Sequence, residues 1–171
     1  MGMIGTDTEK AAGLLRQGQL VAIPTETVYG LAANALDEKA VLRIFEAKQR
    51  PFFDPLIVHV PSLEQALLYA DISDDRLMAL ARRYWPGPLT LLLPKKELLP
   101  PIVTSGLERV GIRVPAHHLT LDLLKETGLP LAAPSANPFG YISPTLAAHV
   151  EKQLGNNVSY ILDGGNCSIG I

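Results

Sequence analysis

A cluster of hydroxyl groups follows the apolar run 20–23. The stretch PTETVYG, residues 24–30, carries Thr25, Thr27 and Tyr29 at alternating positions. Alternate side chains of an extended chain share one face, so this spacing predicts a row of hydroxyls that could line a pocket for a small polar ligand. A turn that uses its hydroxyls to satisfy its own backbone explains the pattern equally well. Both interpretations stay open from the sequence.

Two cations stand at the end of a predicted helix. Lys48 and Arg50 flank Gln49, and the helix must end before Pro51. Together they could hold phosphate oxygens, the guanidinium as a fork and the ammonium as a point charge. Taken alone, such a pair more commonly compensates the helix dipole with its charged groups in water.

Three more polar residues lie in or beside predicted strands. Arg113 follows the apolar Ile112 and faces away from it, so it could clamp a carboxylate or a phosphate, or lie at the surface. His59, inside LIVHV, is either a ligand contact or, more commonly, a hydrogen-bonded residue of the strand. Glu26 points away from the neighbouring threonines, and we expect it in solvent.

The stretch PSANPFGYISPT, residues 134–145, is a candidate anion-binding loop. It carries Ser135, Asn137 and Ser143, and Ser143-Pro144 has the residue types of a helix start. Helix N-termini bind anions readily. An ordinary loop with a capping serine explains the same residues.

Several classes of protein are excluded by missing patterns. The sequence contains neither a G-x-x-x-x-G-K-[ST] loop nor a G-x-G-x-x-G turn, and the zinc spacings C-x-x-C and H-E-x-x-H are missing too, so no metal site is predicted. Cys167 is the single cysteine, which fits a reducing compartment. The chain has neither a secretory signal nor an apolar run of about 18 residues. We therefore expect a cytoplasmic protein without a membrane partner.

Helices and strands are predicted to alternate along one domain. Thr6 and Glu9 have the capping-box spacing for a first helix, and Asp37 and Ser62 could cap the next two. Further helices are predicted over 74–84, 119–127 and 143–154, and strands over 20–23, 56–60, 89–93, 110–114, 131–133 and 160–163. Continuous apolar strands between helices indicate an α/β fold with a twisted, mixed sheet covered by helices. The polar clusters follow strand ends, where such sheets bind ligands.

Six blocks of the sequence, in order, closely resemble the threonylcarbamoyl-AMP synthase family, also called YrdC-like. The blocks are PTETVYGLAANAL, AKQRPFFDPLIVHV, YWPGPLTLLLPK, VGIRVPAHH, APSANPFGYISPT and ILDGGNCSIGI. The resemblance runs from about residue 9 to the last residue. It implies a concave ligand groove and the synthesis of threonylcarbamoyl-AMP and pyrophosphate from L-threonine, bicarbonate or CO2, and ATP with Mg²⁺. Threonylcarbamoyl transferase machinery would then modify tRNA with the product.

The resemblance also implies residue roles. Lys48 and Arg50 match the family's K-x-R motif and would hold ATP phosphates during catalysis. The residues matching the threonine site are Thr25, Thr27, Tyr29, His59 and Arg113. The residues matching the nucleotide site are Lys48, Arg50, Asp54, Thr104, Ala133, Ser135, Asn137 and Ser143.

Two further expectations follow. Family members continue after SIGI with E-S-T and more strands, so residues 1–171 are expected to be a C-terminally incomplete YrdC-like catalytic domain with reduced activity. The competing hypothesis is an RNA-binding module of the same fold, for tRNA or double-stranded RNA, without synthase activity. The formal net charge of -2 and the 6% aromatic content count against it.

Overall fold

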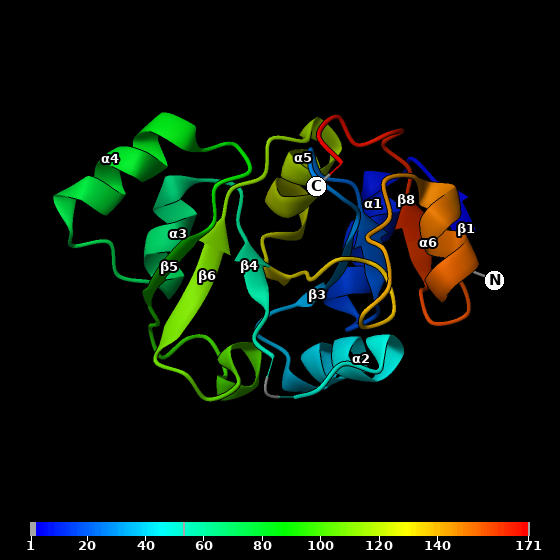
Figure 1. Cartoon of the computed structure of the whole chain (residues 1–171), viewed down its shortest axis with the longest axis horizontal. Coiled ribbons are helices and arrows are strands. Elements are labelled where there is room, and N and C mark those ends of the chain that lie inside the picture. The colour runs from blue at the N-terminus through cyan, green and yellow to red at the C-terminus, as the bar shows by residue number, and fades with distance from the viewer. Residues whose placement is uncertain (1–2, 53, 171) are drawn as a thin grey trace.

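One mixed sheet forms the centre of the molecule (Figure 1). The computed structural model describes residues 3–52 and 54–170, so Phe53 and Ile171, which belong to two of the resembling blocks, lie outside the described residues. The strand order is β1-β8-β2-β3-β7-β4-β6-β5. The strands are β1 (Met3–Gly5), β2 (Val21–Ile23), β3 (Gly30–Asn34), β4 (Ile57–His59), β5 (Leu91–Pro94), β6 (Arg109–Arg113), β7 (Leu131–Ala132) and β8 (Tyr160–Leu162).

The helices lie on both faces of this sheet. They are α1 (Thr8–Arg16), α2 (Glu38–Lys48), α3 (Leu63–Tyr69), α4 (Asp75–Tyr84), α5 (His118–Thr127) and α6 (Ala147–Leu154), with a 3-10 turn η1 (Pro101–Thr104). Figure 1 shows α3 and α4 beside β5 at one end of the sheet and α6 beside β8 and β1 at the other. Among the described residues, no helix combines the length and the apolar character that a membrane crossing requires.

The predicted α/β fold with a mixed sheet is confirmed. The pairs β1–β8, β2–β8 and β4–β6 are parallel, whereas β2–β3, β3–β7, β4–β7 and β5–β6 are antiparallel. Strands β1 and β3 were not predicted from the sequence. The sequence of β3 is Gly-Leu-Ala-Ala-Asn, and most of these residues have low strand propensity, so its strand conformation depends on pairing with β2 and β7.

Strand alternation divides the core into two layers. Val21, Ala32 and Leu131 point to one face, where they pack with α1 and α5. The neighbouring residues Ala22 and Leu31 point to the other face and belong to the larger core that includes residues of α2, α3 and α6. Each helix is therefore fixed to one face, and the loops between elements meet at the edges of the sheet.

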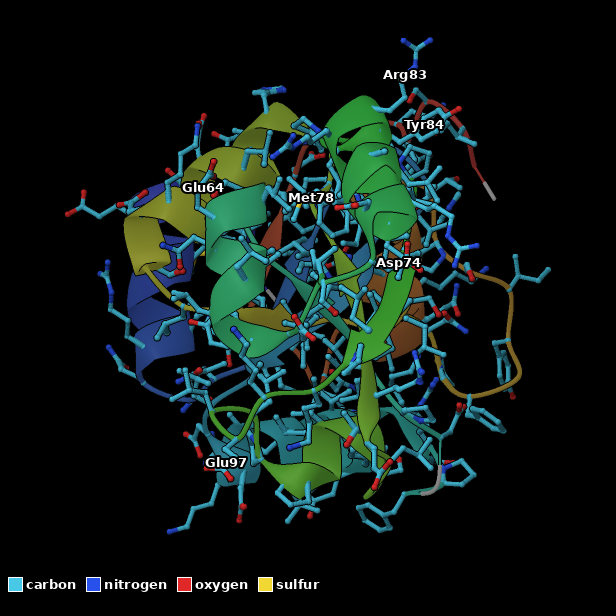
Figure 2. All side chains as sticks on the ribbon, turned by 90° about the vertical axis from the view of Figure 1, so that its left-hand side faces the viewer. Glu64, Asp74, Met78, Arg83, Tyr84 and Glu97 are labelled. Atoms are coloured by element: carbon cyan, nitrogen blue, oxygen red, sulfur yellow. The ribbon has the colours of Figure 1, made fainter. Side chains whose placement is uncertain are left out.

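Side-chain caps start three of the helices, and two of them, Asp37 and Ser62, were predicted. Asp37 Oδ1 accepts from the backbone N–H groups of Lys39 at 2.9 Å and Ala40 at 3.3 Å at the start of α2. Ser62 caps α3, and Asp74 caps α4. Figure 2 shows Asp74 at the beginning of α4, with Arg83 and Tyr84 at its other end.

Two predicted helix starts are wrong. Asp7, not Thr6, caps α1, because its Oδ1 accepts from Lys10 N at 2.9 Å. Helix α6 begins at Ala147 rather than at Ser143. The intervening segment is held by other backbone bonds: Pro144 O accepts from Tyr29 N at 2.8 Å, and Thr145 O accepts from Cys167 N at 3.0 Å.

The α1 cap can be tested with two neighbouring exposed residues. Asp7→Ala is expected to lower the free energy of unfolding by about 1 kcal/mol, because the Lys10 N–H loses its acceptor. Thr6→Ala is the matched control and should change it by less than about 0.5 kcal/mol. Urea denaturation followed by circular dichroism measures both. A larger decrease in the free energy of unfolding for Thr6→Ala than for Asp7→Ala would show that Thr6 caps α1, as the sequence suggested.

Candidate functional site

The face of the sheet that carries α1 and α5 is open over β4 and β6. Ile57 and His59 of β4 pair in parallel register with Gly111 and Arg113 of β6 on this strip. Two cavities lie over it. One of about 300 Å³ is called here the polar cavity, the other of about 620 Å³ the apolar cavity, and Ile57 lines both. The two cavities therefore lie next to each other on this strip.

The polar cavity collects residues from both candidate clusters. It is lined by Thr25, Thr27, Val28, Gly30, Ile57, His59, Pro88, Arg113, Ala133, Pro134 and Ser135. The threonines come from the turn after β2, and the alanine and serine come from the loop after β7. Four of the five residues predicted to bind threonine line this one cavity.

The turn after β2 is built by Thr25. Its Oγ1 accepts from the backbone N–H groups of Thr27 at 3.2 Å and Val28 at 3.1 Å, and donates to Val28 O at 2.6 Å. The Thr27 hydroxyl lies 2.9 Å from Thr25 Oγ1 and accepts from Arg113 Nη2 at 3.1 Å. Thr25 thus satisfies the backbone of the turn, and Thr27 connects that turn to Arg113. The turn interpretation is confirmed for Thr25, both threonines line the polar cavity, and their contact with a ligand stays a prediction.

Tyr29 does not share the face of the two threonines. Because residues 24–28 form a turn, the alternation expected of an extended chain is lost. The buried Tyr29 hydroxyl donates to Gly165 O at 2.8 Å and accepts from Gly164 N at 3.1 Å. Burial raises the pKa of Tyr29 to about 12. Tyr29 therefore holds the loop after β8, and its predicted contact with threonine stays a prediction.

Glu26 forms a buried ion pair with Arg113. Glu26 Oε1 lies 2.7 Å from Arg113 Nη2, and both side chains are 10% exposed. Glu26 Oε2 accepts from Ala116 N at 3.0 Å. The expectation that Glu26 lies in solvent is wrong. Arg113 could have indicated the burial of Glu26, because a buried cation requires a buried counter-charge.

Two buried nitrogen atoms of residues that line the polar cavity have no hydrogen-bond partner among the described residues. Within residues 3–52 and 54–170, His59 Nδ1 and Arg113 Nε are buried and have no hydrogen-bond partner. Burial, and then the charge of Arg113, lowers the pKa of His59 to about 3, so its imidazole is neutral at pH 7. A guanidinium, a neutral imidazole and a hydroxyl suit a ligand with an anionic group.

Lys48 is buried at the end of α2. Its ammonium donates to the backbone carbonyls of Ser135 and Asn137. Burial and the charge of Arg50 lower the pKa of Lys48 to about 8. The alternative in which the Lys48 charge lies in water is therefore wrong. Lys48 ties α2 to the loop after β7, next to the wall that Ser135 gives the polar cavity.

Arg50 is held two residues further on, after Gln49 has turned the chain through a left-handed conformation with φ 52°. Arg50 Nη2 lies 2.8 Å from Asp54 Oδ2 and donates to Pro55 O at 3.2 Å, and Nε donates to Asp54 O at 3.2 Å. Its guanidinium lies 5.8 Å from the ring centre of Phe139. Asp54 thus orients Arg50, and Pro55 reaches from there to the apolar cavity.

The other nucleotide candidates occupy different places. Asn137 Nδ2 donates to the carbonyls of Pro138 at 2.9 Å and Tyr141 at 2.8 Å, which shapes the loop after β7. Ala133 N donates to Ile57 O at 2.9 Å in the floor of the polar cavity. Thr104 is buried in η1, and its hydroxyl donates to Leu107 O at 2.8 Å.

Ser143 is half-buried in the segment before α6 and does not cap that helix. The structure thus brings Ala133, Ser135 and Lys48 together and uses Thr104 for local structure. The nucleotide roles of all these residues stay predictions.

The apolar cavity was missed by the sequence analysis. Its lining is Pro55, Leu56, Ile57, Thr90, Leu92, Gly106, Leu107, Glu108, Arg109 and Gly111. Gly111 keeps it deep, since a Cβ there would lie 3.2 Å from Thr90 Cγ2. Motifs of polar residues cannot indicate a cavity lined mainly by apolar residues.

In the part of the chain that the structure describes, no three histidine, cysteine, aspartate or glutamate residues gather as a metal site.

Curated relatives match almost the whole chain. The threonylcarbamoyl-AMP synthase of Pyrococcus abyssi is 53% identical over 161 residues, which are 94% of this chain and 47% of that protein. The threonylcarbamoyl-AMP synthase of Bacillus subtilis is 50% identical over 163 residues, 95% of this chain and 47% of that protein. The chain therefore spans about half the length of these relatives.

Solved structures of similar proteins superpose on almost the whole chain. P. abyssi Sua5 in complex with L-threonine superposes with a TM-score of 0.95 at 48% identity, over 99% of this chain and 52% of that one. Full-length HypF has a TM-score of 0.82 at 23% identity, over 96% of this chain and 26% of that one, which shows the fold alone. Residues 13–171 match the Sua5/YciO/YrdC family model, described as telomere recombination. The chain belongs to the Sua5/YciO/YrdC family.

Proposed function

We propose that this domain makes threonylcarbamoyl-AMP and pyrophosphate from L-threonine, bicarbonate or CO2, and ATP. The observation that carries the proposal is the meeting of Arg113 and His59 in the polar cavity, where Arg113 Nε and His59 Nδ1 have no hydrogen-bond partner among the described residues. Both residues line a cavity of about 300 Å³, a size that suits an amino acid. The names of the curated relatives and the L-threonine complex of P. abyssi Sua5 support the choice of ligand.

Threonine would bind in the polar cavity with its carboxylate, or the carbamate formed on its nitrogen, on Arg113. A guanidinium and a carboxylate form strong, charge-assisted hydrogen bonds. His59 could exchange a hydrogen bond with a polar group of the ligand, and so could the Thr27 hydroxyl. Thr25 would act by holding the turn that carries Thr27.

ATP would lie with its phosphates between Lys48 and Arg50, the proposed catalytic cations. Ser135, Asn137 and Asp54 hold the two cations in place through the contacts given above. The apolar cavity of about 620 Å³, which Pro55 connects to Arg50, is large enough for the nucleoside. Mg²⁺ would arrive with ATP and be held mainly by phosphate and water oxygens.

The chemistry requires positioned reactants rather than a nucleophile of the enzyme. The threonine amine loses a proton as it forms a bond to CO2, and an oxygen of the resulting carbamate attacks the α-phosphate of ATP while pyrophosphate leaves. Fixing these reactants beside one another supplies much of the rate enhancement. Lys48 and Arg50 would stabilise the charge that develops on the phosphate oxygens. The product would pass to threonylcarbamoyl transferase machinery for the N6-threonylcarbamoyladenosine modification of tRNA.

Calorimetric titration tests the amino-acid site. L-threonine is expected to bind at least about 10-fold more tightly than L-serine, because a methyl group in a fitted pocket gives this discrimination. Arg113→Ala should weaken L-threonine binding by about 10- to 100-fold, since it removes hydrogen bonds to a charged group. The exposed Arg83→Ala, on α4, is the matched control (Figure 2). A folded chain that binds neither amino acid, but binds RNA in a salt-dependent way, would favour the RNA-binding alternative.

The pH dependence of nucleotide binding tests Lys48. Its pKa of about 8 predicts that affinity for ATP with Mg²⁺ falls between about pH 7 and about pH 9, because phosphate prefers the charged ammonium. Lys48→Arg should remove this decline, since a guanidinium stays charged in that range. Lys39→Arg, exposed on the same helix, should keep it. A decline that persists in Lys48→Arg would assign the titration to another group.

A further inference from the structure

We propose that Glu26 is a positioning residue: it holds the Arg113 guanidinium in the orientation that receives the carboxylate of the ligand. The inference rests on the proposed function for the identity of that ligand. Its structural part, the restraint of Arg113, can be tested in the ligand-free chain.

Glu26 is itself fixed from two directions. Its carboxylate accepts the Ala116 N–H at 3.0 Å, and Ala116 follows Arg113 by three residues, just past the end of β6. Its backbone carbonyl accepts the Ile169 N–H at 2.9 Å, from the segment after β8. A carboxylate anchored in this way is a fixed acceptor, so the geometry of the ion pair is set by the fold rather than by two flexible side chains.

The ion pair determines which donors of Arg113 are used. Nη2 lies 2.7 Å from Glu26 Oε1 and donates to Thr27 Oγ1 at 3.1 Å. In the described chain, the buried Nε–H donor remains without an acceptor. Glu26 and Thr27 therefore hold one end of the planar guanidinium and so fix the direction of its other N–H donors.

The pair also changes how the cavity attracts its ligand. Both side chains are 10% exposed, so their charges are compensated within the protein. Attraction then depends on the direction of the remaining N–H donors more than on net charge. Loss of Glu26 would free the guanidinium to rotate toward other acceptors, and the preference for a ligand that carries a carboxylate would fall.

The first measurement is made without ligand. Nitrogen-15 relaxation of the Arg113 Nε–H group should indicate a rigid side chain in the parent chain, and Glu26→Gln should lower its order parameter below about 0.6, the range of flexible groups. Glu97→Gln, which removes an exposed carboxylate between β5 and η1, is the matched control (Figure 2). An Arg113 signal that stays rigid in Glu26→Gln would overturn the inference.

The second measurement compares L-threonine with L-threonine amide, which lacks the carboxylate. Glu26→Gln should reduce the ratio of the two affinities by about 10-fold while amide binding stays within about 2-fold, because only carboxylate recognition passes through Arg113. Equal losses for both ligands would indicate a purely structural role and overturn the inference. Where Glu26→Gln fails to fold, judged by thermal melting, Glu26→Asp replaces it in both measurements, with the same criteria. A parent chain with a rigid Arg113 that binds no threonine would contradict the proposed function while leaving the restraint by Glu26 intact.

Discussion

A buried positive charge on the open strip of the sheet is the constraint around which the polar cavity is built. Arg113 sits at the end of β6 with little contact to solvent, and burial of an uncompensated guanidinium is costly. The carboxylate of Glu26 compensates this charge and the hydroxyl of Thr27 accepts a hydrogen bond from it, and both residues belong to the turn after β2. Hydrogen bonds from Thr25 and from the segment after β8 hold this turn in place. Strands far apart in the sheet order are thereby joined at one guanidinium.

A second buried cation connects the other half of the site. Lys48 ends α2, and its ammonium is bound by the carbonyls of the loop after β7, so the helix and the loop keep a fixed distance. The ion pair with Asp54 orients the Arg50 guanidinium. Both cations are thus oriented before any ligand arrives, which is the condition under which fixed charges stabilise a developing charge without reorganisation.

The sequence predicted the alternation of elements, the mixed α/β sheet and two helix caps, Asp37 and Ser62, because these depend on local periodicity and on single capping residues. It did not predict β3, whose strand conformation depends on its neighbours, or the start of α6, which is delayed by backbone bonds to Tyr29 and Cys167. Within the site, residue types indicated Thr27, His59 and Arg113. The direction of Tyr29 and the burial of Glu26 depend on a turn, and turn geometry does not follow from alternation.

Ile57 lines both the polar and the apolar cavity. It is branched at Cβ and sits on a strand paired on both sides, so its side chain has few conformations available. The spacing between the two compartments is consequently set by a rigid part of the sheet, not by a loop. Two molecules bound in them would both contact Ile57, so the distance between them would be set by the sheet.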